Sequence, residues 1–162
     1  MVHARAPADA ATYEERLRPP VWVWLVSWFV VATFGVAVLF SAGEIAGGMA
    51  VIVPGAAVTV GLIRGTPRVA VREGELVAGR AHISVALLGP PEALDAAAAR
   101  HLRGPGADPT AYHLIRPWTL GAVRVGVTDL DDPTPYWYVA TRHPDRLAAA
   151  VRAAQQLHSG PP

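Results

Sequence analysis

Residues 22–40 read WVWLVSWFVVATFGVAVLF, and residues 45–63 read IAGGMAVIVPGAAVTVGLI. Over the whole stretch the one charged side chain is Glu44, which lies in the turn between the two runs. A helix of about 20 apolar residues crosses a hydrocarbon core of roughly 30 Å. Since the stretch is about twice that length, it predicts a two-helix transmembrane hairpin over residues 21–64.

The flanking arginines indicate how the hairpin is oriented. Arg16 and Arg18 precede the first run, Arg64 and Arg68 follow the second, and the turn between the runs has no arginine. Positive residues concentrate on the cytoplasmic side of membrane proteins, so we expect both termini to be cytoplasmic. The chain is thus predicted to be a multi-pass protein of the plasma membrane, with the lipid bilayer as its first partner.

Small residues in the second run indicate how the two helices pack. Gly47, Gly48 and Gly55 are among several that allow another helix to approach closely. The first run is the nearest candidate for that helix. A buried hairpin of a soluble protein is less well supported, because no other segment is apolar enough to cover it. A cleaved signal peptide would be shorter and would begin earlier.

The amino-acid composition excludes cysteine-dependent sites and argues against a nucleic-acid partner. All 14 basic residues are arginine, and the chain has no cysteine. Disulfides, thiolate metal sites and a cysteine nucleophile are therefore excluded. After Gly65 ten arginines are matched by nine acidic residues. Because a nucleic-acid partner requires a basic excess, we do not expect one.

The rest of the chain predicts one small cytoplasmic domain over residues 65–158, with a cytoplasmic segment over residues 1–20 and a tail over residues 159–162. Turn signals at Glu73-Gly74 and Gly79-Arg80 predict a meander of about three strands. The remaining elements expected here are a broken strand or loop over residues 87–94, a short helix between Asp95 and Gly104, and strands over residues 112–115, 122–128 and 136–141.

The last element is an amphipathic helix from about Pro144 to Leu157. Its apolar stripe consists of Leu147, Ala150, Val151, Ala154 and Leu157. Such a helix must bury its stripe against the sheet. The predicted fold class is α+β: a transmembrane hairpin followed by an antiparallel-sheet domain closed by a C-terminal helix. In the order of its elements this domain resembles bacterial pleckstrin-homology-like domains.

Several local motifs carry a closer resemblance. They are YEERLRPPVWVW at residues 13–24, GPGADP at 104–109, RPW at 116–118, and DPTPYW at 132–137 followed by Thr141-Arg142. In this order they resemble an uncharacterised actinobacterial membrane family, domain of unknown function 3093, over about residues 13–152. The resemblance implies a topology and a lineage but no activity.

The residues predict no catalytic centre and no cofactor. The histidines lack the HxH, HxxxH or HExxH spacing of metal ligands, so no metal site is expected. Asp129, Asp131 and Asp132 form an acidic cluster, but they lack the glycine and distal glutamate of a calcium loop. We interpret them as turn-forming residues.

The strand over residues 136–141 carries the strongest binding candidates. Alternation places Trp137 on the core side, and we expect Tyr136 and Tyr138 at the surface. In the alternative, alternate rings fill the core of the domain while the others cover its rim. The predicted binding residues are Arg116, Trp118, Tyr136, Tyr138 and Arg142.

Two classes of function follow. We favour a membrane-anchored cytoplasmic interaction or scaffolding module that meets a protein partner or a second copy of the chain, and not an enzyme. The alternative is a small enzyme or lipid-handling protein at the membrane face that uses Asp129, Asp131, Asp132, His113 and Arg116. An enzyme needs polar groups that converge in a concave site, whereas a module can present an exposed patch.

Overall fold

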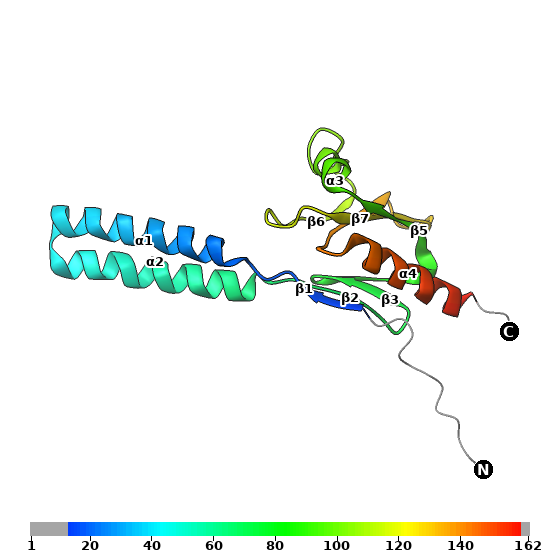
Figure 1. Ribbon diagram of the computed structural model, residues 1–162, viewed down its shortest axis with the longest axis horizontal. Helices are drawn as coiled ribbons and strands as arrows, with labels where there is room; N and C mark the ends of the chain where they lie inside the picture. The colour runs from blue at the N-terminus through cyan, green and yellow to red at the C-terminus, as the bar shows by residue number, and fades with distance from the viewer. Residues whose placement is uncertain (1–12, 160–162) are drawn as a thin grey trace, which may run out of the picture. The chain divides into compact units, whose positions relative to one another are not determined.

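The computed structural model describes residues 13–159 (Figure 1). The chain is an α+β protein with two compact units. One unit is a helical hairpin over residues 18–66, and the other is an α+β domain built from residues 13–17 and 67–159. The predicted segment 1–20 and tail 159–162 lie partly outside the described residues.

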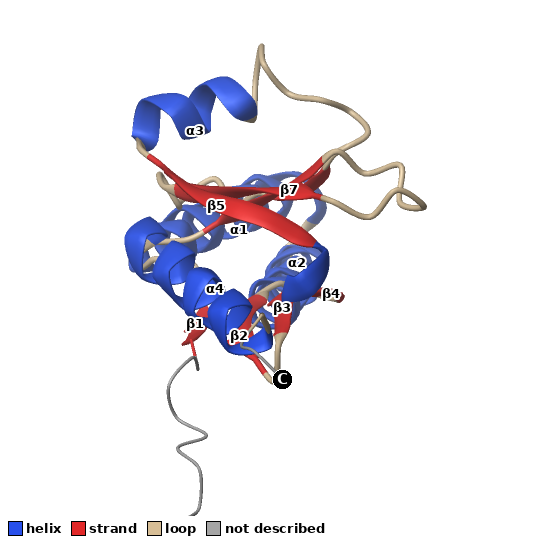
Figure 2. Cartoon of the chain, turned by 90° about the vertical axis from the view of Figure 1, so that its right-hand side faces the viewer, coloured by secondary structure: helices blue, strands red, loops and turns tan. Residues whose placement is uncertain are grey.

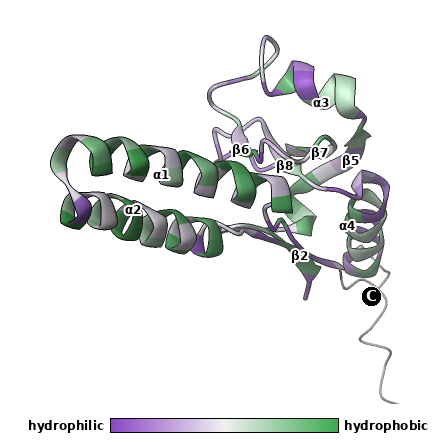
Figure 3. Cartoon of the chain, turned by 60° about the vertical axis from the view of Figure 1, so that its left-hand side comes forward, coloured by the Kyte–Doolittle hydropathy of each residue, from purple (hydrophilic) through white to green (hydrophobic). Residues whose placement is uncertain are grey.

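The hairpin consists of α1 (Val21–Ala42) and α2 (Glu44–Arg64), as predicted. Gly43 joins them with φ of 89°, a conformation that favours glycine. Each helix is long and apolar enough to cross a membrane. Only 11% of the apolar 18-residue stretch of each helix is buried. Figure 3 shows hydrophobic residues along both helices.

Glycines lie where the two helices touch. A Cβ on Gly47 would come within 2.9 Å of Leu39 Cα, and a Cβ on Gly55 would come within 2.9 Å of the Trp28 ring. Gly35 is buried, and a Cβ there would clash with the side chain of Val51 on α2. The prediction that small residues of the second run let the first run approach is therefore confirmed.

The first sheet has the order β1-β2-β3-β4 and is antiparallel throughout. Its strands are β1 (Tyr13–Arg16), β2 (Arg68–Arg72), β3 (Glu75–Ala78) and β4 (Ala81–Ser84). The predicted three-stranded meander corresponds to β2–β4, and its two turns lie where expected. Glu73 and Gly74 both have positive φ, as a tight two-residue hairpin requires.

Strand β1 was not predicted, and it changes the boundary of the domain. It pairs with β2, so that Arg16 lies opposite Arg68. Beyond this pair Leu17 N donates a hydrogen bond to Pro67 O at 3.1 Å, and Leu17 is fully buried. The helical hairpin is thus an insertion between two paired strands of one sheet.

The second sheet has the order β5-β7-β8-β6. Its strands are β5 (Leu88–Leu94), β6 (Tyr112–Leu114), β7 (Ala122–Val127) and β8 (Tyr136–Ala140). A 3₁₀ turn, η1 (Val85–Leu87), precedes β5. Strand β6 runs parallel to β8, so the prediction of a purely antiparallel domain is wrong at this pair. Pro90 and Pro91 are tolerated because β5 is an edge strand, and its register shifts there.

Helix α4 (Pro144–His158) lies between the two sheets, and α3 (Ala96–Leu102) lies on the opposite face of the second sheet (Figure 2). The buried residues of α4 are Leu147, Ala148, Val151 and Ala154. The predicted helix and most of its stripe are confirmed. Leu157, in the last turn of the helix, is an exception, being 68% exposed.

Candidate functional site

The tyrosines of β8 are not at the surface. Tyr136 and Tyr138 are 5% and 1% exposed, and Trp137 is also buried. Tyr138 donates a hydrogen bond to Ala99 O of α3 at 3.2 Å, and Tyr136 Oη accepts one from Asp108 N at 3.2 Å. The prediction of an exposed tyrosine patch is therefore wrong, because α3 and the loop after it cover the second face of β8. The core position of Trp137 is confirmed.

His113 of β6 joins the covered tyrosines. Its ring centroid lies 5.8 Å from that of Tyr138 and 6.0 Å from that of Tyr136. Its Nδ1 lies 2.9 Å from Ala111 O. The Arg124 guanidinium lies 4.7 Å from the centroid of the Tyr136 ring. These contacts form a packed layer beneath α3, and burial raises the pKa of Tyr138.

The acidic loop after β7 has a turn-forming role, as interpreted from the sequence. Asp129 Oδ1 accepts a hydrogen bond from Asp131 N at 3.0 Å, and Asp132 Oδ1 accepts one from Thr134 N at 2.9 Å. Hydrogen bonds from Thr134 lower the pKa of Asp132. Among residues 13–159 no group of His, Asp and Glu side chains could hold a metal ion.

The residues of the enzyme alternative do not converge. The acidic loop follows β7, whereas Arg116 lies in the loop that precedes β7. The two loops are therefore at opposite ends of a six-residue strand, about 20 Å apart. His113 is the middle residue of the edge strand β6 and is paired with Tyr138 of β8.

Three of the five predicted binding residues lie at one end of the domain. Arg116 and Trp118 belong to the loop over residues 115–121, and Arg142 follows β8. Thr141 N donates a hydrogen bond to Gly121 O at 3.1 Å, which holds the second stem of the loop beside Arg142.

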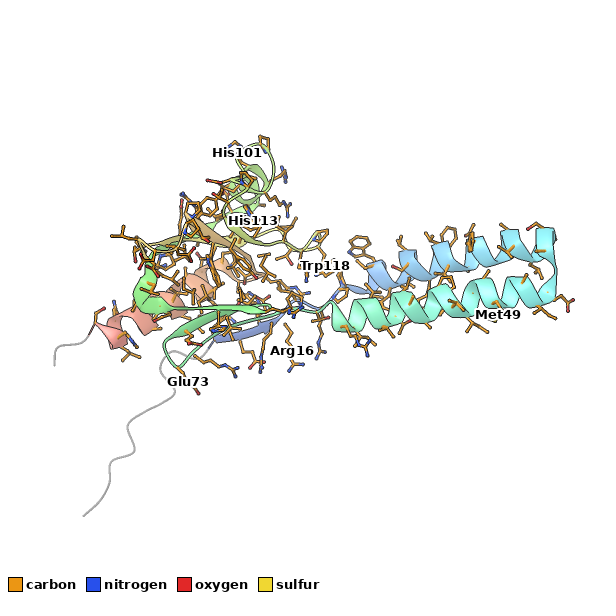
Figure 4. All side chains as sticks on the ribbon, turned by 180° about the vertical axis from the view of Figure 1, so that it is seen from behind. Arg16, Met49, Glu73, His101, His113 and Trp118 are labelled. Carbon is orange, nitrogen blue, oxygen red and sulfur yellow. The ribbon has the colours of Figure 1, made fainter. Side chains whose placement is uncertain are left out.

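The two linkers that connect the domain to the hairpin begin at the same end of the domain. At the first stem of the loop, Leu114 Cδ1 lies 3.4 Å and Pro67 Cβ lies 3.7 Å from the Cβ position of Gly79. Leu17 is hydrogen-bonded to Pro67. We call this end of the domain the linker end: Leu17, Pro67, the turn at 79–80, the loop over 115–121, and Thr141-Arg142. Figure 4 shows Arg16 and Trp118 toward this end and Glu73 at the opposite end.

The linker end exposes apolar and basic side chains together. In the loop over 115–121, Leu120 is 61% exposed, Pro117 is exposed and Trp118 is half-buried. The indole Nε1–H of Trp118 has no acceptor among the described residues. Four arginines lie in or next to the segments of this end: Arg80 and Arg142 are exposed, Arg116 is half-buried, and the exposed Arg16 has its Nε 3.8 Å from Glu14 Oε1.

Glu15 fixes β1 to this end, a role that the sequence analysis missed. Its Oε2 accepts hydrogen bonds from the hydroxyls of Tyr13 at 2.7 Å and Thr141 at 2.5 Å. Its Oε1 accepts one from Arg142 N at 3.1 Å. Burial raises the pKa of Tyr13 to about 12. The alternation of Tyr13, Glu15 and Leu17 was the available signal for this strand.

A family model described as "Protein of unknown function (DUF3093)" matches residues 12–151. Since the match covers most of the 162 residues, the chain belongs to this family, and the family resemblance of the motifs is confirmed. Neither a curated protein nor a solved structure matches the chain. The likeness to pleckstrin-homology-like domains therefore stays a prediction.

Proposed function

We propose that this member of the DUF3093 family is a multi-pass plasma-membrane protein whose hairpin holds the α+β domain at the cytoplasmic surface as an interaction or scaffolding module. The observation that carries the proposal is the insertion of α1 and α2 between the paired strands β1 and β2. An anchor attached through two paired strands limits the rotation of the domain more than one flexible tether would.

Two properties of the hairpin support membrane insertion. Its exposed side chains are large and apolar, including Phe29, Phe40 and Ile52. Its buried residues are mainly glycines, which is the packing typical of helices in lipid. The arginines before α1 and at the end of α2 support cytoplasmic termini.

The edge strand β4 supports a protein partner for the module. Within the described residues β4 pairs only with β3, so its outer edge offers backbone groups for another strand. Both edges of the second sheet are blunted: β5 carries two prolines, and β6 has three residues. We propose that a partner segment, from another protein or a second copy, adds to β4.

Fractionation and reporter fusions test the membrane part. We expect the full chain to remain in the membrane pellet after alkaline carbonate extraction. Reporters that work only in the cytoplasm should be active when fused after Pro162, and inactive when inserted at Gly43. Release by carbonate, or an active periplasmic reporter at the C-terminus, would contradict the proposal.

Site-specific photo-crosslinking in native membranes tests the partner part. A photoreactive residue at His82, which is exposed on β4, should give discrete protein adducts. The control position is Arg152, which is exposed on α4. Adducts at His82 that do not exceed those at Arg152 would exclude β4 as the interaction edge, while leaving the membrane topology intact.

A further inference from the structure

We propose that the loop over residues 115–121 enters the headgroup layer of the bilayer and recognises anionic phospholipid. This inference rests on the proposed insertion of the hairpin and adds a second membrane contact to it. The ligand is the headgroup of the surrounding lipid, and the contact is made by apolar and basic side chains at the linker end.

The covalent connections keep the linker end near the bilayer once the hairpin is inserted. Three residues, Arg18 to Pro20, separate Leu17 from α1, and two residues separate α2 from Pro67. Extended chain spans at most about 3.6 Å per residue, so neither linker reaches far beyond about 15 Å. Because Pro67 and Leu114 both lie beside Gly79, the loop that follows Leu114 begins next to the point where the second linker ends.

The loop has the side chains of an interfacial segment. Trp118 offers an aromatic ring with a donor, and indoles prefer the headgroup boundary. Its Nε1–H is shielded and lacks an acceptor in the domain, so a rotation of the ring towards lipid would supply phosphate or ester oxygens. Leu120 and Pro117 are exposed beside it and provide apolar surface for the layer below the headgroups.

The backbone that presents these side chains is held in place. Thr119 is 1% exposed, and its carbonyl accepts a hydrogen bond from Arg103 Nη1 at 3.1 Å. Gly121 O accepts from Thr141 N. Trp118 and Leu120 therefore flank an anchored residue, so the loop presents them from a fixed stem.

The loop over residues 115–121 differs in charge from the exposed loop over residues 128–135, which follows β7. Leu130 is 101% exposed, but it lies between Asp129 and Asp131, which an anionic surface repels. Leu120 instead lies at the end of the domain that carries Arg116 and Arg142. An exposed leucine alone does not indicate a membrane contact. Its combination with an indole and arginines is what favours an anionic lipid surface.

The experiment uses the full chain in vesicles with single cysteines, since the natural chain has none. A small fluorophore is attached to Leu120→Cys, to Leu130→Cys as the matched exposed leucine, or to Val53→Cys as a reporter of hairpin insertion. Vesicles contain phosphatidylcholine with or without phosphatidylglycerol. Quenching is measured with headgroup-labelled nitroxide lipid, with acyl-chain nitroxide lipid and with aqueous iodide.

We expect headgroup nitroxides to quench the Leu120→Cys probe several-fold more than the Leu130→Cys probe, and iodide to show the reverse order. Phosphatidylglycerol should increase the quenching at Leu120→Cys. When Arg142→Gln is added, the partitioning of the loop into phosphatidylglycerol vesicles, measured by this quenching, should fall about fivefold. This is the effect of one arginine near an anionic surface. The Leu130→Cys signal should not respond to either change.

Equal quenching of the two leucine probes, or quenching that does not depend on phosphatidylglycerol, would overturn the inference. The Val53→Cys probe separates this result from a failure of the proposed function. Acyl-chain nitroxides should quench it whether or not the loop binds lipid. If they do not, the hairpin is not inserted, and both proposals are wrong.

Discussion

The hairpin and the α+β domain have opposite distributions of large and small residues. In the hairpin the buried residues are Val31, Gly35, Gly47 and Gly55, while phenylalanines, leucines and isoleucines are exposed. In the domain the buried residues include Leu76, Tyr138, Leu147 and Val151, while the exposed residues are mostly polar or charged.

This difference is the one expected if, as proposed, the hairpin lies in lipid and the domain lies in water. In water, the burial of large apolar side chains drives folding. In lipid that driving force is absent between helices, and close packing through small residues replaces it. Substitutions at buried positions should therefore act through different mechanisms in the two units, and matched exposed positions provide the controls.

The largest effect is expected for a charge in the core of the domain. Leu147→Asp places an unpaired carboxylate on the fully buried face of α4 and should destabilise the domain by about 4 kcal/mol or more. The control is Leu157→Asp, at a position that is 68% exposed, which should cost about 0.5 kcal/mol or less. Thermal unfolding of the full chain in detergent measures both. Similar losses would show that α4 does not pack by its predicted face.

The next effect concerns the covered tyrosines. Tyr138→Ala should cost about 3–5 kcal/mol, because it removes a buried ring. Tyr138→Phe keeps the ring and removes the hydroxyl, whose loss should cost about 1 kcal/mol. Chemical denaturation distinguishes the two variants. A Tyr138→Ala variant with unchanged stability would mean that α3 does not cover this face.

A smaller effect is expected for glycines in the hairpin. Gly47→Ala places a Cβ against the backbone of Leu39, and overpacking of this kind costs about 1–3 kcal/mol. Gly48→Ala is the matched control, because its Cβ would have no described atom within 4 Å. The midpoint temperature of helix unfolding in mild detergent should fall for Gly47→Ala only. If both behave alike, α1 and α2 do not pack through this glycine.

The smallest effect concerns the attachment of β1. Tyr13→Phe removes the hydroxyl that donates to Glu15, at a cost of about 1 kcal/mol near neutral pH. Burial raises the pKa of Tyr13 to about 12, above an unfolded value near 10.0. The natural chain should therefore lose stability as the pH rises from 10 to 12, because the unfolded state ionises first. The Tyr13→Phe variant should lose less stability over this pH range. Identical stability profiles of the two proteins would contradict the hydrogen bond between Tyr13 and Glu15.

The sequence predicted the hairpin, the meander and α4 because their signals are local. A long apolar run, two-residue turns containing glycine, and a helical stripe each depend on neighbouring residues. The exposure of Leu157 shows the limit of these signals, because a periodic pattern does not say which of its positions the sheet covers.

The missed features depend on contacts distant in the sequence. Strand β1 is four residues long, and it pairs with β2, which is separated from it in the sequence by the whole hairpin. The parallel pair of β6 and β8 and the covering of Tyr138 by α3 also join separate segments. Of the predicted binding residues, the structure groups Arg116, Trp118 and Arg142 at the linker end and removes the two tyrosines from the surface.

The most direct test of the account joins strand pairing and membrane topology. Glu14 and Ala70 lie opposite each other on β1 and β2, so Glu14→Cys with Ala70→Cys should form a disulfide when intact cells are oxidised. The control pairs Glu14→Cys with Val77→Cys, which lies one strand further away. A protease site inserted at Gly43 is then cut by protease added outside intact cells. The account predicts two fragments that stay joined until reduction, and only for the first pair. A chain that resists external protease, or fragments that separate without reduction, would contradict it.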